Sequence, residues 1–194
     1  MPLLPLEPFV YPEDLLGARP APAPVVREEG GRWWVVHARP RAEKALARKL
    51  HGAQVNFVLP LYRKDWRAGG RGRTSFVPLF PGYLFVNGDD RARSAVLQTN
   101  QVARLLQVPN EAELHDDLRR VYQLMQSEQA VAPEDDLRPG TVVRIVEGAL
   151  AGLEGKVLRR GKRLRFVVEV HFLQRGVSVE VESWMIQRVG ARAV

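Results

Sequence analysis

Residues 77–86 read Val-Pro-Leu-Phe-Pro-Gly-Tyr-Leu-Phe-Val, an apolar run in which Pro81-Gly82 interrupts the pattern of a strand. Side chains alternate between the two faces of a strand, so Tyr83 and Phe85 share one face. The opposite face must pack against helices to form a core. The alternation therefore leaves the face of Tyr83 and Phe85 free to bind a partner, unless both rings also belong to the core.

Strand and helix patterns alternate on either side of this run. Strand patterns rich in β-branched and aromatic residues cover Trp33–Ala38, Val55–Tyr62, Phe76–Val86 and Val102–Val108. Helical spacing of apolar residues covers Arg41–Gly52 and Arg91–Gln98. A Gly- and Arg-rich hairpin tip at 67–73 joins the second strand to the third. The order strand, helix, strand, strand, helix, strand predicts a ferredoxin-like α/β sandwich.

The remaining patterns divide the chain into four segments. Residues 1–30 hold half of the 14 prolines, which predicts an extended or disordered tail. We place the α/β domain at 31–126, ending in a helix capped by Asn110, and a polar, acidic linker at 127–137. Residues 138–194 contain several short β-rich runs, which predicts a small closed β-barrel and an α+β chain overall.

Charge is distributed unevenly along a chain of net charge +7. Residues 31–109 hold 14 basic and 4 acidic residues, whereas residues 110–136 hold 2 basic and 8 acidic residues. Clustered Lys and Arg attract phosphate backbones without sequence preference. The alternative is that these side chains only solvate the surface. Arg41, Lys44 and Arg48 recur at helical spacing, so we expect one basic stripe that points away from the apolar face of the helix.

No pattern for catalysis or for a metal is present in the sequence. The chain has no cysteine. Its four histidines are scattered and form no metal-binding motif: they are His37, His51, His115 and His171. Phosphate-loop and nucleophile-elbow motifs are absent. We therefore expect no enzyme, no catalytic residue, no metal and no cofactor. Because no apolar run of about 18 residues and no signal-peptide pattern is present, we expect a cytoplasmic protein without membrane contact.

Two segments together resemble the NusG family of transcription elongation factors. Residues 77–86, with the opening Trp33-Trp34-Val35-Val36 and the basic helix after it, resemble the NusG N-terminal domain. The run Gly140-Thr141-Val142-Val143-Arg144-Ile145, with Gly148, Gly152, Gly155 and Val157, resembles the KOW motif of an SH3-like β-barrel. The resemblance covers about residues 32–189. It implies a non-enzymatic, monomeric factor that binds RNA polymerase, closes its clamp over DNA, and reduces pausing or termination.

The resemblance also implies which residues make each contact. Those that match the polymerase-binding pocket, which receives the clamp helices of the largest subunit, are His37, Phe80, Tyr83 and Phe85. Those on the path of the non-template or upstream DNA are Arg39, Arg41, Lys44, Arg48, Lys49, Thr99 and Asn100. The Arg-rich tip at 67–73 is a weaker candidate for DNA contact. For each set the alternative is an ordinary role in the core or on a solvated surface.

In the second domain, Leu150 and Phe172 match apolar loop positions that family members present to a small-subunit ribosomal protein or to termination factor Rho. Packing within the barrel is an equally good reading of both side chains. The strand around Tyr83 resembles specialised antitermination paralogues such as RfaH more than the housekeeping factor. The β-prone runs after residue 163 predict a barrel and not a helical hairpin. The rival function is a ribosome- or RNA-binding KOW protein with no polymerase role.

Overall fold

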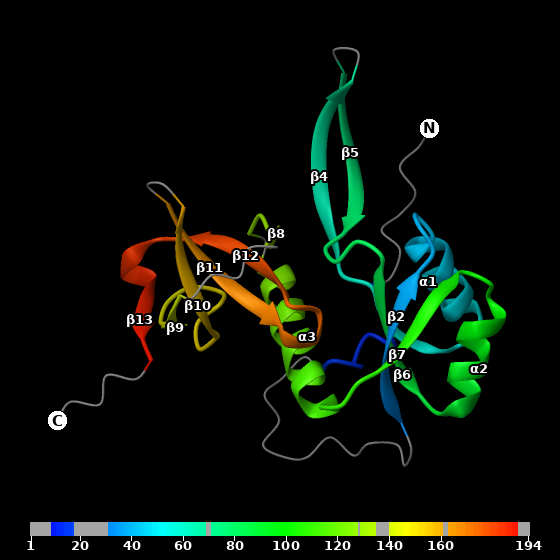
Figure 1. The fold of residues 1–194 in the computed structure, drawn as a ribbon. Coiled ribbons are helices and arrows are strands. Elements are labelled where there is room, and N and C mark those ends of the chain that lie inside the picture. Colours follow the sequence, from blue (N-terminus) through cyan, green and yellow to red (C-terminus); the bar gives the residue numbers. More distant parts are fainter. Residues whose placement is uncertain are drawn as a thin grey trace. The chain divides into compact units, whose positions relative to one another are not determined.

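The computed structural model describes residues 9–17, 31–68, 71–127, 129–134, 140–160 and 163–189, and Figure 1 shows its elements. The chain forms two compact units, Met1–His115 and Asp116–Val194. The division falls within the third helix, α3 (Glu111–Gln126). Sheets and helices occur together in the chain, so the fold is α+β. The domain bounds drawn from the sequence stay a prediction.

The first unit is built on a five-stranded antiparallel sheet. Its strands run in the spatial order β1 (Val10–Tyr11), β3 (Asn56–Val58), β6 (Tyr83–Gly88), β2 (Arg32–Ala38) and β7 (Val102–Gln107). Two helices, α1 (Glu43–Gly52) and α2 (Asp90–Gln98), lie beside the sheet (Figure 1). Leu46 and Leu50 of α1 and Val96 of α2 are completely buried in one cluster with Val36 and Leu84 of the sheet. This cluster is the core that holds α1 in place.

The N-terminal segment corrects one expectation. Residues 9–17 are not a free tail, because Val10 and Tyr11 pair with Val58 and Phe57 and add β1 to the edge of the sheet. Val10 is 5% exposed, and Tyr11 packs edge-on against His51 with ring centroids 4.8 Å apart. The prediction overlooked that two apolar residues suffice to pair with an open strand edge. The rest of residues 1–30 lies outside the described residues.

Two further strands leave the sheet as a hairpin. β4 (Leu61–Ala68) and β5 (Arg71–Pro78) pair only with each other and project from the first unit, as Figure 1 shows. We predicted single strands over 55–62 and 76–86, but residues 59–60 and 79–82 break both. Leu79 N donates to Pro60 O at 2.8 Å and closes the base of the hairpin, where Leu61 is buried. The central residues of the predicted tip, 69–70, lie outside the described residues.

The second unit is a six-stranded antiparallel sheet that α3 accompanies. Its spatial order is β13 (Ile186–Arg188), β9 (Thr141–Ile145), β10 (Glu154–Arg160), β11 (Arg163–Val170), β12 (Arg175–Val181) and β8 (Ala132–Glu134), with short 3-10 turns η1 (His171–Leu173) and η2 (Ser183–Met185). The β-prone runs after residue 163 thus form strands. Residues 132–134, predicted as linker, pair instead with 176–178. Closure of the sheet into an SH3-like barrel stays a prediction.

Candidate functional site

The side chains of His37 and Tyr83 face each other on neighbouring strands of the first unit. β2 pairs antiparallel with β6, and these two residues are directly opposite in the register. Their rings stack with centroids 5.0 Å apart and planes inclined by 23°. Both residues are partly exposed. The two strands therefore present an accessible aromatic pair, which combines a large contact area with polar ring atoms.

The turn that precedes β6 holds this pair in position. Gly82 has φ +85°, a backbone conformation that residues other than glycine rarely adopt. A Cβ at this position would lie 3.3 Å from the His37 ring. Gly82 N donates to the Glu43 carboxylate of α1 at 2.8 Å, and Ala38 N donates to Gly82 O at 2.8 Å. Bonds to α1 and to β2 therefore fix the turn, and the glycine lets the imidazole approach the backbone.

The other two predicted pocket residues, Phe80 and Phe85, lie inside the unit. Their exposed fractions are 1% and 0%, and their rings meet edge to face with centroids 6.0 Å apart. The register confirms that Phe85 shares a face with Tyr83. The expectation that this face leaves Phe85 open to solvent is wrong, because the ring is fully buried. The two phenylalanines support the site from within and do not present their own rings.

Arg39, Lys49, Thr99 and Asn100 are far apart in the sequence but meet at one corner of the first unit, which we call the basic corner. Lys49 Nζ donates to Thr99 O at 2.8 Å, and Arg39 N donates to Gln101 O at 2.8 Å. Thr99 is only 9% exposed, and its hydroxyl donates to a carbonyl at the end of α2, so it serves the turn. Asn100 is exposed with φ +58° at the tip of that turn. The structure thus brings together four predicted DNA-facing residues.

The basic stripe on α1 is shorter than predicted. The helix begins at Glu43, and Arg41 stands before it with φ +62°, so it does not share the helical spacing of Lys44 and Arg48. The prediction failed because the spacing alone cannot show where the first turn begins, and Ala42 contributes no side-chain cap. Lys44 and Arg48 stay one turn apart on α1, and Arg41 is exposed beside them in the chain.

The predicted partner residues of the second unit differ in exposure. Leu150 is 4% exposed and lies in a turn where Gly148 has φ +85° and Gly152 has φ +89°. This side chain therefore packs inside the unit. Phe172 is half-buried in η1. Of the two, only Phe172 offers a partly open ring to a partner.

Exposed apolar side chains that the sequence reasoning missed lie on another part of the second unit. Trp184 is 62% exposed, and the valines at 142, 146 and 189 are 38–44% exposed. Val189 N donates to Val142 O at 3.1 Å, and Val146 N donates to Met185 O at 2.9 Å, so these residues come from adjacent segments. The sequence gives little signal, since Trp184 follows Glu182 and Ser183 but precedes the apolar Met185 and Ile186. We call Val142, Val146, Trp184 and Val189 the apolar edge.

Neither a metal site nor a membrane span is found in the described parts of the chain. No group of three His, Asp or Glu residues among them is arranged to hold a metal ion. None of the helices described has the length and apolar character that crossing a bilayer requires.

Comparison with known proteins finds a family match and distant structural matches. Residues 31–125 match the family described as "Transcription termination factor nusG". No curated protein matches the chain. Among solved structures, a chain from the "Crystal Structure of MjSpt4:Spt5 complex conformation B" is 14% identical, with 84% of this chain and 99% of that chain covered and a TM-score of 0.25.

Proposed function

We propose that this chain, whose residues 31–125 match the NusG family, is a transcription elongation and antitermination factor that acts while bound to RNA polymerase. Its first unit, in this proposal a ferredoxin-like domain, binds the clamp helices of the largest polymerase subunit. A ligand shifts a conformational equilibrium only through its different affinity for the two states. A factor that binds the closed clamp more tightly therefore favours closure over DNA, and pausing and termination decrease.

The observation that carries the proposal is the stacked pair of His37 and Tyr83. Partly exposed aromatic side chains at a rigid position are typical anchors of protein interfaces, because few rotamers are lost on binding. Here the Gly82 turn and Glu43 fix the position. Phe80 and Phe85 support the pair from the interior, so the proposed contact narrows from four residues to His37 and Tyr83.

The basic corner supports contact with the non-template or upstream DNA strand. Arg39 and Lys49 supply its cations and Asn100 lies exposed at its turn, while Lys44 and Arg48 add cations along α1. Phosphate contacts by such side chains position a protein on DNA without selecting a sequence. We therefore assign to this corner a positioning role, weakened by added salt.

For the second unit we propose recruitment of a small-subunit ribosomal protein or of termination factor Rho. The burial of Leu150 leaves Phe172 as the accessible member of the predicted pair. The apolar edge is the larger exposed apolar feature of this unit, and such features mark interaction surfaces more often than buried side chains do. It is the surface to compare with Phe172 in a binding experiment.

An elongation assay on a paused polymerase complex tests the main proposal. The full chain shortens the pause, and Tyr83→Ala reduces its apparent affinity for polymerase by about 10-fold, since an interface anchor contributes on the order of 1–2 kcal/mol. Leu97→Ala is the matched control: Leu97 is 42% exposed in the same unit but lies on α2, away from the pair.

Two outcomes contradict the proposal. One is no change in pausing or termination at saturating protein. The other is equal loss of polymerase binding in Tyr83→Ala and Leu97→Ala, which would place the contact elsewhere. Capture of ribosomes without polymerase, unaffected by Tyr83→Ala, would favour the rival function of a ribosome- or RNA-binding KOW protein.

A further inference from the structure

The hairpin of β4 and β5 has two chemically different faces. Residues directly opposite in an antiparallel pair lie on the same face, so the register assigns each side chain. Trp66 is opposite Arg73, and Lys64, two residues before Trp66, shares its face. Asp65 belongs to the other face, opposite Thr74. The Trp66 face therefore combines aromatic and basic side chains and carries no acidic residue among its described positions.

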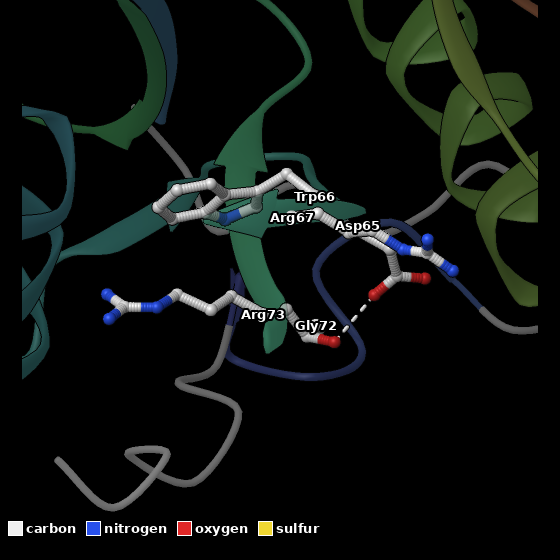
Figure 2. Close-up of a pocket in the computed structure, with 6 residues that line it drawn as sticks. Asp65, Trp66, Arg67, Gly72 and Arg73 are labelled. Atoms are coloured by element: carbon white, nitrogen blue, oxygen red, sulfur yellow. Dashed lines mark hydrogen bonds between the residues drawn. The ribbon is translucent and has the colours of Figure 1, made fainter. Parts of the chain in front are cut away.

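Trp66 is held open to solvent on this face. Its side chain is 44% exposed, and the guanidinium of Arg73 lies 5.6 Å from the centre of the indole ring. Figure 2 shows Trp66 and Arg73 extending to one side of the hairpin, and Arg67 and Asp65 to the other. A cation over an indole face stabilises the ring's position even in water. The indole is thus oriented although no core surrounds it.

The single acidic side chain of the hairpin is engaged away from Trp66. Asp65 accepts a hydrogen bond from the Thr74 hydroxyl at 2.5 Å and one from Arg63 Nε at 3.1 Å. The Thr74 bond first, and then that of Arg63, lower the pKa of Asp65 below its usual value, so it is ionised and partnered at neutral pH. Its charge therefore offsets Arg63 and leaves Lys64 and Arg73 as the charges beside the indole.

The shape of the hairpin suits a strand that is not base-paired. The protruding two-stranded hairpin offers one exposed ring with Arg73 opposite it and with Lys64 about 7 Å away along β4. Proteins that bind single-stranded nucleic acid combine these features, because bases stack on the ring and cations follow the phosphates. A base inside a duplex has both faces covered by its neighbours and cannot stack in this way.

We propose that Trp66 is a stacking platform for an unpaired nucleobase, with Arg73 and Lys64 as contacts to the adjoining phosphates. This site lies on the hairpin and not at the basic corner, and it needs no polymerase to bind. It therefore goes beyond the proposed function and can hold or fail independently of it.

Fluorescence anisotropy with the full chain and labelled oligomers of about 12 nucleotides tests the proposal. The probes are oligo(dT), oligo(rU), an abasic strand of equal length and charge, and a duplex. Trp66→Leu, which removes the ring but keeps an apolar side chain, weakens binding to oligo(dT) or oligo(rU) by about 5- to 10-fold, the lower end for one stacked base. Binding to the abasic strand and to the duplex stays unchanged.

Three matched variants complete the test. Trp66→Phe keeps a stacking ring and retains most of the affinity for oligo(dT). Trp184→Leu removes an even more exposed indole from the second unit and leaves all four affinities unchanged. Lys64→Gln weakens binding to oligo(dT) and to the abasic strand alike and reduces the salt slope by about 0.7. If Trp66→Leu weakens the binding of oligo(dT) more than that of oligo(rU), the site prefers DNA, and the opposite result identifies RNA.

The proposal is overturned if Trp66→Leu weakens oligo(dT), abasic strand and duplex equally, because the ring would then act only through the structure of the hairpin. It is also overturned if Trp66→Leu changes no affinity. Either result leaves polymerase binding through Tyr83 untouched, since the oligomer experiment contains no polymerase.

Discussion

Removal of the Asp117 carboxylate should destabilise the second unit. Asp117 lies on α3 and is completely buried. It accepts hydrogen bonds from the backbone N of His171 at 2.9 Å, from His171 Nδ1 at 3.0 Å and from Arg120 Nη2 at 2.6 Å. The two bonds from His171 join α3 to the turn η1 that follows β11, whereas Arg120 lies on α3 itself. Phe172 is the next residue of that turn, so the carboxylate also positions a predicted partner contact.

The three bonds contribute unequally to the effect of Asp117→Ala. The side chains of His171 and Arg120 are 47% and 33% exposed, so both can turn to water when the carboxylate is removed, and their loss contributes little. The backbone N–H of His171 is fixed in the turn η1 and points at a completely buried carboxylate, and leaving such a donor without an acceptor costs about 1–3 kcal/mol. We expect Asp117→Ala to lower the free energy of unfolding by about 2–3 kcal/mol. Asp117→Asn, which keeps one oxygen as acceptor, should lower it by less.

Urea denaturation of the full chain, followed by hydrogen exchange resolved at single amides, measures this effect. The His171 amide and the amides of β12 should exchange faster in Asp117→Ala. Asp116→Ala is the control, because the neighbouring carboxylate on the same helix is exposed. If both variants unfold at the same urea concentration and the His171 amide exchanges as in the unmodified chain, the assigned role of the buried carboxylate is refuted.

Two further predictions concern turns and close contacts. Asp89 caps α2, and its pKa lies below the usual value chiefly because its carboxylate accepts a hydrogen bond from Ala92 N. The cap therefore stabilises the fold above the usual pKa of an aspartate, and this stabilisation disappears as the pH falls through the lowered pKa. Asp89→Ala should therefore lower the melting temperature at pH 7, with a difference that shrinks in acid; a constant difference would exclude the cap as its cause. Gly155→Ala places a Cβ 2.5 Å from Val167 O and should destabilise the chain by about 2 kcal/mol or more in urea denaturation. Gly52→Ala, where a Cβ meets nothing within 4 Å, should cost nothing, and equal effects would refute the steric reason.

Local patterns in the sequence predicted the elements whose own residues determine them. The apolar face of α1 with Leu46 and Leu50 and the Asn110 cap both occur, the cap with Glu113 N donating to Asn110 Oδ1 at 3.2 Å. The strand predicted at Trp33–Ala38 occurs as Arg32–Ala38. Periodicity and capping are properties of neighbouring residues, so one sequence suffices to read them.

Elements that depend on distant partners were not predictable in the same way. β1 and β8 are strands of two and three residues, too short for a pattern, and each exists because an open edge of a distant strand accepts it. Pro133 in β8 even argued against a strand, although prolines are tolerated at sheet edges. Whether such a segment forms a strand is decided by its pairing with a distant strand and not by its local propensity.

The candidate site shows the same division between pattern and three-dimensional context. Alternation correctly placed Phe85 on the face of Tyr83, but it cannot tell which positions of a face are covered, and Phe85 is buried while Tyr83 is partly exposed. Leu150 likewise matched a loop position yet packs inward. Trp66 gave no signal beyond its Arg-rich surroundings, because its significance comes from the residue opposite it in the hairpin.

Helix α1 links the two surfaces proposed to contact polymerase and DNA. Near its start Glu43 accepts from Gly82 N and fixes the turn beside the aromatic pair, and near its end Lys49 donates to Thr99 O and fixes the basic corner. Six residues of helix separate these anchors by about 9 Å along the axis. Because Leu46 and Leu50 hold the same helix against the sheet with no exposed surface, neither anchor can shift without disturbing the core. The spacing between the two contact surfaces is therefore set by the packing of one short helix within the first unit.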